Sequence, residues 1–167
     1  MNASRSNQGP VHQYLAGDHD RLGRLLDDAL QPASMDLASY EAFRAGLLRH
    51  IGLEEKLVFP VARRTGDAAT QAMISRLHQE HALFAAMLVP TPTVEILSQL
   101  RDLLVSHNQR EEAPGGMYQI AERIAGGEVK ALADQLRAGP EARVAAHFDT
   151  ALVHENIRAL MKALQTA

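Results

Sequence analysis

The sequence predicts an all-α fold, an antiparallel up-down four-helix bundle followed by a helical C-terminal extension. Apolar residues recur about every 3.6 positions along almost the whole chain, and no stretch alternates as a strand does. Proline and glycine divide this pattern into segments of similar length with short connections, which favour antiparallel neighbours. The length of 167 residues suits a single domain with a sizeable core.

Capping and breaking residues predict where each helix begins and ends. Pro10 suits the first turn of the first helix, and Pro32 follows its end. Asp36 is the expected N-cap of the second helix and Gly66 its stop, while Pro90 follows the third. The expected helices cover about 10–30, 36–64, 68–89 and 93–113, then 117–125 and 128–138, and a last one from near Pro140 to about 165.

Three segments follow from this pattern. We expect a flexible N-terminus over 1–9, the four-helix bundle over 10–118, and a helical extension over 119–167 that packs on the bundle. The N-terminus lacks an apolar signal-peptide core, and no apolar run approaches the ~18 residues of a membrane span. A cytoplasmic protein that does not enter a membrane is therefore expected.

The composition excludes several kinds of chemistry. The chain contains no cysteine, which rules out disulfides, thiolate metal sites, iron–sulfur clusters and cysteine nucleophiles. The net charge is only -3 and no basic tract is present, so no nucleic-acid partner is expected. Eight histidines remain as the most informative residues.

The second helix carries a histidine and a glutamate on its apolar face. Residues at i, i+4 and i+7 share one face of a helix, which places His50 and Glu54 among the hydrophobic residues and Glu55 at the edge. The residues of this stripe are Phe43, Leu47, His50, Ile51, Glu54, Leu57, Val58 and Val61.

The fourth helix repeats this arrangement with His107 and Glu111, so that HIGLEE corresponds to HNQREE. The first and third helices each add a core-facing histidine, His19 and His81. The chain therefore reads as two halves, each with a lone-histidine helix followed by a His-x-x-x-Glu helix. We interpret this as an internal pseudo-repeat.

A pair of metal ions would explain why these polar groups point into the core. A buried, unpaired carboxylate costs several kcal/mol or takes up a proton. Neutral imidazoles can instead fill terminal positions on each ion while two carboxylates bridge the ions. Nitrogen and oxygen ligands without sulfur suit iron, manganese or zinc, and a bridged pair favours iron.

Each histidine also has a structural alternative, because lone core histidines are commonly hydrogen-bonded rather than metal-bound. The coincidence of two His-x-x-x-Glu copies with two further inward histidines favours the metal site. His78 is open between a ligand and a hydrogen-bond partner of a ligand. His12 is expected in a core or access role, and His147 and His154 on a solvated face of the last helix.

Four motifs resemble the hemerythrin-like (HHE cation-binding) domains over about residues 10–118: DHD (18–20), HIGLEEKLVFP (50–60), HQEH (78–81) and HNQREE (107–112). The resemblance implies an up-down bundle around a non-haem di-iron site with bridging carboxylates. Carried onto this chain, the implied ligands are His19, His50, Glu54, His81, His107 and Glu111. The helix-3 histidine spacing of three, and a glutamate four residues after His107, resemble the bacterial and regulatory branch rather than the oxygen carriers.

Three functions remain open from the sequence. The first is a di-iron protein that binds a small diatomic molecule, dioxygen or nitric oxide, or peroxide, for storage, delivery or sensing. The second is a di-iron redox enzyme in nitrosative or oxidative stress or in iron–sulfur repair, for which no catalytic residue is assigned. The third is a zinc-binding or metal-free interaction module. Homo-oligomerisation is left open, and Glu-x-x-His and H-E-x-x-H metal motifs are absent.

Overall fold

The computed structural model describes residues 8–31 and 34–166, and within these residues the regular elements are all helical. The all-α prediction is confirmed. Residues 1–7, most of the expected flexible N-terminus, lie outside the described residues. The helices are α1 (Pro10–Ala29), α2 (Leu37–Leu53), α3 (Phe59–Ala62), α4 (Ala68–Met87), α5 (Val94–Glu112), α6 (Met117–Ala125), α7 (Val129–Arg137) and α8 (Ala151–Thr166), with a π-helical segment at Glu54–Val58 and 3-10 turns at Arg63–Thr65 and Gly126–Glu128.

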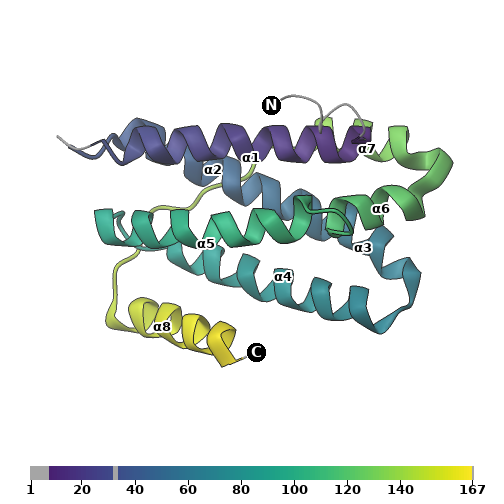
Figure 1. The fold of residues 1–167 in the computed structure, drawn as a ribbon. Coiled ribbons are helices and arrows are strands. Elements are labelled where there is room, and N and C mark those ends of the chain that lie inside the picture. Colours follow the sequence, from purple (N-terminus) through teal and green to yellow (C-terminus); the bar gives the residue numbers. More distant parts are fainter. Residues whose placement is uncertain (1–7, 32–33, 167) are drawn as a thin grey trace.

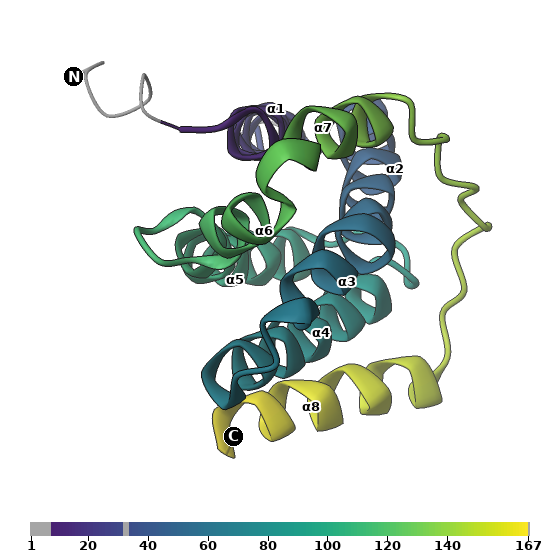
Figure 2. The same ribbon diagram turned by 90° about the vertical axis from the view of Figure 1, so that its right-hand side faces the viewer.

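The long helices α1, α2, α4 and α5 surround a common interior. Figure 1 shows α1, α4 and α5 running side by side, with α6 and α7 at one end. Seen from that end, α6 and α7 close the bundle and α8 lies along the outside of α4 (Figure 2). The C-terminal extension therefore supplies both an end cap and an external helix.

The expected capping residues begin and end the bundle helices. Pro10 lies in the first turn of α1. The side chain of Asp36 accepts hydrogen bonds from two backbone N–H groups at the start of α2. Gly66 adopts a left-handed conformation with φ of 71° at the end of the 3-10 turn that follows α3. Thr93, which was not predicted as a cap from the sequence, caps α5 by accepting one hydrogen bond from the N–H of Ile96.

The helix expected over 36–64 is interrupted by the π-helical segment. Pro60 lies within this helical path, and a proline ring clashes with the carbonyl four residues earlier, that of Lys56. The wider π turn instead pairs the N–H of Phe59 with the carbonyl of Glu54. This extra residue shifts the helical face, so Phe59 and Ala62 are fully buried, whereas Val61 of the expected stripe is only partly buried.

The last helix begins later than the sequence predicts. It was expected from near Pro140, but α8 starts at Ala151, and residues 139–150 form an extended strap (Figure 2). The strap is fixed to the bundle by the backbone hydrogen bond from Phe148 to the carbonyl of Val89, 3.0 Å long. Thr150 then accepts hydrogen bonds from the first turn of α8, which explains why the helix begins there.

The prediction of a solvated helical face is wrong for His147. This residue lies in the strap, where its Nε2 is 2.7 Å from Glu41 Oε1 and its ring stacks on Tyr40 with a centroid distance of 5.8 Å. His154 lies in α8 and is partly buried. His147 therefore takes part in packing the extension onto the bundle.

The hydrophobic core consists of two clusters. One contains residues from the α6–α7 end, and the other contains residues from the opposite end together with α8. Along α1, Leu15 belongs to the first cluster and Leu22 to the second, with His19 between them. Along α4, Leu77 and Leu83 flank His81 in the same way. A polar layer therefore separates the two clusters.

Candidate metal centre

The structure brings all six residues predicted from the sequence into this polar layer. Their donor atoms form two groups, each with members within 4.8 Å of one another, and all six side chains are buried. The first group contains His19, His50, Glu54 and Glu111, and the second contains Glu54, His81, His107 and Glu111. Their role as ligands stays a prediction, but their convergence is a property of the fold.

Two glutamates are common to both groups, and we call Glu54 and Glu111 the inner carboxylates. Glu54 Oε1 lies 3.2 Å from His50 Nε2, and its other oxygen lies 3.3 Å from His81 Nε2. Glu111 Oε2 lies 3.4 Å from His19 Nε2 and 3.2 Å from His107 Nε2. Carboxylates placed between two pairs of imidazoles are suited to bridge two cations.

Each of the four imidazoles contacts a second carboxylate through its other nitrogen. We call these four side chains the outer carboxylates. Each lies next to a member of the two groups in the sequence, but binds the ring carried by a neighbouring helix. The pairs are Asp18–His50 (2.9 Å), Glu55–His81 (2.8 Å), Glu80–His107 (2.9 Å) and Glu112–His19 (2.6 Å), each measured to Nδ1.

The outer carboxylates determine which nitrogen of each ring is available to a metal ion. A carboxylate accepts a hydrogen bond from Nδ1–H, so the proton stays on Nδ1 and Nε2 keeps the lone pair that can bind a metal ion. In all four rings Nε2 points to an inner carboxylate. The four rings are therefore oriented in the way that metal-binding histidines with carboxylate partners require.

Arginines neutralise part of the negative charge of the outer carboxylates. Arg21 Nε lies 2.8 Å from Asp18. Arg76 and Arg110 both lie 2.9 Å from the same oxygen of Glu80, whose other oxygen contacts His107. These ion pairs keep the carboxylates ionised and hold them in place.

The carboxylates raise the pKa values of the rings. Burial by itself lowers the pKa of His50, but Glu54 and Asp18 outweigh it and raise the pKa to about 9. Burial is likewise outweighed by neighbouring carboxylates at His81 and His107, where the pKa is also raised to about 9. Without metal, the surrounding carboxylates therefore favour the protonated form of these rings.

The pKa values of the inner carboxylates are lowered, in contrast to those of the imidazoles. Burial and the charge of Glu54 raise the pKa of Glu111, but His107 and His19 outweigh them and lower it to about 2. The pKa of Glu54 is well below its ordinary value because neighbouring imidazolium rings outweigh burial. The centre is thus a place where positive charge is stabilised, whether it comes from protons or from metal ions.

Tyr118, which was not predicted from the sequence, places its hydroxyl among the donor atoms of the first group. Its hydroxyl is 2.6 Å from Glu54 Oε1 and 3.0 Å from Glu111 Oε2, and it lies 3.2 Å from His19 Nε2 and 3.5 Å from His50 Nε2. Burial and the two carboxylates raise the pKa of Tyr118 well above its ordinary value. No spacing rule points to it, since it follows the chain reversal after α5.

The structure places His78 outside both groups. Its side chain is 68% exposed, and its Nδ1 lies 2.9 Å from Glu55 Oε1, the oxygen that also contacts His81. This geometry matches a partner of an outer carboxylate rather than a ligand. His12, in contrast, is buried, and its ring packs edge-on against Tyr118.

The residues fit a metal pair. Glu54 Oε2, His81 Nε2 and Glu111 Oε1 are buried and make no hydrogen bond with the described residues, although His81 Nε2 lies 3.3 Å from the first oxygen and 4.0 Å from the second. All three belong to the second group, where they face one another. Buried polar atoms are normally satisfied, and a cation within the group would satisfy all three.

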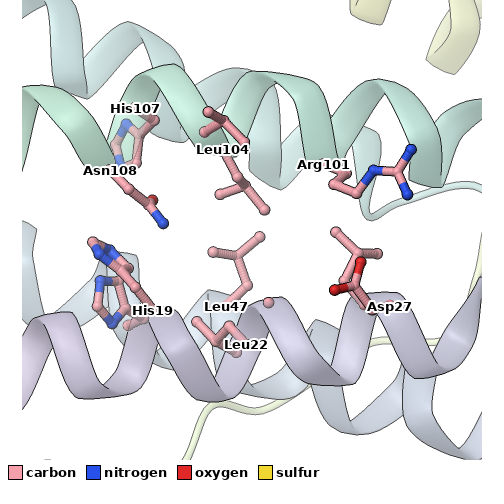
Figure 3. A pocket seen from close by; sticks show the side chains of 12 residues that line it. His19, Leu22, Asp27, Leu47, Arg101, Leu104, His107 and Asn108 are labelled. Carbon is pink, nitrogen blue, oxygen red and sulfur yellow. The ribbon is translucent and has the colours of Figure 1, made fainter. Parts of the chain in front are cut away.

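A cavity of about 260 Å³ leads from the surface to the imidazoles of His19, His50 and His107. Figure 3 shows it between α1 and α5, with His19, His107 and Asn108 at one end and Asp27 and Arg101 at the other. Its walls are mostly apolar. Leu22, Leu47 and Leu104 line the middle (Figure 3). The polar centre is thus reached through a mainly aliphatic passage.

Fold and centre together define an all-α bundle with a buried His/Glu cluster that could hold metal ions. Residues 11–114 match the hemerythrin HHE cation binding domain, and the chain belongs to this family. No curated protein and no solved structure matches the chain significantly. None of the described helices combines the length and hydropathy that a membrane span requires.

Proposed function

We propose that this chain is a non-haem di-iron protein of the cytoplasm that binds a small molecule for storage, delivery or sensing. Dioxygen is the first candidate ligand, and nitric oxide and peroxide are the others. The observation that carries the proposal is the pair of buried groups that share two carboxylates and adjoin an apolar cavity. The alternatives are a di-iron redox enzyme of oxidative or nitrosative stress or of iron–sulfur repair, and a non-redox interaction module that binds zinc or no metal.

The donor set supports iron as the metal. Each group offers two imidazole nitrogens and two shared carboxylates, without sulfur. Such ligands suit iron, zinc and manganese. Iron bound here would supply redox chemistry and coordination positions for a small molecule. His19, His50, His81 and His107 would hold the ions, and Glu54 and Glu111 would bridge them.

The cavity supports a small, weakly polar ligand. A cavity of about 150 Å³ with aliphatic and aromatic walls stays dry and has room for benzene, so about 260 Å³ is ample for a diatomic molecule. The aliphatic walls disfavour water and ions. His19, His50 and His107 at the inner end would meet an entering molecule beside the ions.

Metal reconstitution followed by ligand binding tests the proposal. The purified protein is loaded anaerobically with ferrous iron, its iron content is measured, and optical spectra are recorded before and after exposure to dioxygen or nitric oxide. We expect about two irons per chain and a spectrum that changes with each gas. A chain that takes up only zinc, or no metal after this treatment, overturns the iron proposal. Repeated consumption of nitric oxide or peroxide favours the enzyme alternative.

A further inference from the structure

Tyr118 reaches the centre from outside the segment that matches the family. The match ends at residue 114, and α6 begins at Met117 after a chain reversal. Gly116 makes this reversal possible, because a Cβ there would lie 2.6 Å from the carbonyl oxygen of Arg110. The side chain of Tyr118 is fully buried among the residues of the first core cluster.

The hydroxyl oxygen of Tyr118 contacts every member of the first group and neither imidazole of the second. It lies 2.6–3.5 Å from donor atoms of Glu54, Glu111, His19 and His50. Metal–ligand distances to nitrogen and oxygen are about 2.0–2.2 Å. Two ligand atoms at right angles on one ion are therefore about 3 Å apart, and the oxygen of Tyr118 lies at such distances from the four donor atoms.

We propose that Tyr118 is a seventh ligand of the metal pair and binds the ion of the first group through its phenol oxygen. This inference rests on the proposed function. On binding, the Oη–H bond breaks, the metal–oxygen bond forms and the proton leaves to solvent; no electron is transferred. A phenolate is an anionic oxygen donor, and iron accepts tyrosine as a ligand in proteins.

With Tyr118 as a ligand, the two ions have different numbers of protein ligands. The first group then offers five protein residues and the second offers four, although the rest of the centre is duplicated. The ion of the second group keeps the larger number of free positions. The cavity reaches both groups, because His19 and His50 of the first group and His107 of the second all line it.

Spectroscopy of the ferric protein tests the inference. The chain is loaded anaerobically with ferrous iron and then oxidised, and resonance Raman spectra are recorded under the visible absorption band. We expect phenolate ring vibrations in the wild type, their loss in Tyr118→Phe with iron content retained, and no change in Tyr40→Phe. Tyr40 is a matched control because it is equally buried but stacks on His147.

The outcomes separate this inference from the function on which it rests. Wild-type protein that binds two irons without phenolate vibrations overturns the ligand role of Tyr118 and leaves the di-iron proposal standing. Vibrations that persist in Tyr118→Phe also overturn it. Wild-type protein that binds no iron overturns both. If Tyr118→Phe does not take up iron, the double variant Tyr14→Phe/Tyr40→Phe decides, since the chain has three tyrosines: vibrations retained there assign the ligand to Tyr118, and vibrations lost there refute it.

Discussion

Glu80 of α4 holds the ring of His107 of α5: its Oε2 lies 2.9 Å from Nδ1, and both side chains are buried. The same relationship recurs around the bundle: Asp18 of α1 contacts a ring on α2, Glu55 of the π-helical segment after α2 contacts one on α4, and Glu112 of α5 contacts one on α1. The helices are therefore linked in a closed circuit of carboxylate–imidazole pairs. Four helices that position one another's rings can hold a metal site to close tolerances.

Removing one outer carboxylate should weaken metal binding without removing a ligand. In Glu80→Gln the ring of His107 loses an anionic acceptor, and such partners are typically worth about 10- to 100-fold in metal affinity. We expect a loss of this size in chelator competition. Glu155→Gln, a change at an exposed position on α8, is the control. Equal affinities for the two variants would contradict the role given to the outer carboxylates.

Removing a member of the two donor groups should reduce iron binding more than removing an outer carboxylate. His50→Ala and Glu111→Ala each delete a donor, and Glu111 is common to both groups. We expect iron content to fall from about two per chain to less than one, as measured by elemental analysis. His147→Ala and His78→Ala should keep their iron, because neither residue belongs to the groups. The ligand assignment is wrong if all four variants load equally.

The stability of the metal-free protein should decline on the alkaline side. His50, His81 and His107 have pKa values of about 9 in the folded chain against 6.5 ordinarily. Because the folded state holds these protons more tightly, their contribution is complete below pH 6.5 and is lost as the pH rises through about 9. Thermal unfolding of the metal-free protein should show this fall in Tm. A Tm that rises over this range would refute it.

At low pH the inner carboxylates should make the stability of the metal-free protein rise with pH instead of falling. Glu111 has a folded pKa of about 2 against 4.5 ordinarily. Its contribution is therefore complete above pH 4.5 and disappears as the pH falls through about 2. Considering these groups alone, Tm should be highest between about pH 4.5 and 6.5. Metal-loaded protein, whose rings bind ions in place of protons, should not lose stability between pH 6.5 and 9.

Filling the cavity should slow ligand binding and leave the metal in place. Gly23 lines the cavity on α1, and a Cβ there meets nothing within 4 Å. Gly23→Leu should lower the association rate of nitric oxide about tenfold in stopped-flow measurements. Its helix stability should rise by about 0.5–1 kcal/mol.

Gly17→Leu is the matched control for this variant. Gly17 lies in the same helix, a Cβ there also meets nothing within 4 Å, and the residue lies outside the cavity. The helix should gain the same stability while ligand association is unchanged. If both variants bind nitric oxide at the wild-type rate, the cavity is not the entry path.

Much of the centre could be predicted from helical periodicity. The His-x-x-x-Glu spacing places His50 with Glu54, and His107 with Glu111, on inward faces, because one helical turn separates the members of each pair. The structure confirms that these faces meet. Helical periodicity depends only on local geometry. It can therefore predict which side chains share a face within a single helix.

Features that depend on neighbouring helices could not be predicted in this way. The outer carboxylates lie beside the apolar stripes, and only the packing of the next helix shows what they contact. The π-helical segment follows from Pro60 within a helical path, a signal that periodicity ignores. Tyr118 follows a chain reversal and belongs to no repeat. The strap before α8 mixes apolar with charged residues, and its hydrogen bonds to the bundle are made to residues distant in the sequence.

The division of the imidazoles between the two groups follows the division of the sequence. His19 and His50 come from the first half of the chain and belong to one group, while His81 and His107 come from the second half and belong to the other. Each half contributes one inner carboxylate to both groups. The protein is thus organised like a homodimer joined into one polypeptide, in which each half completes the group of the other. A fragment that ends after the π-helical segment would keep Glu54 but would lack Glu111, which both groups need.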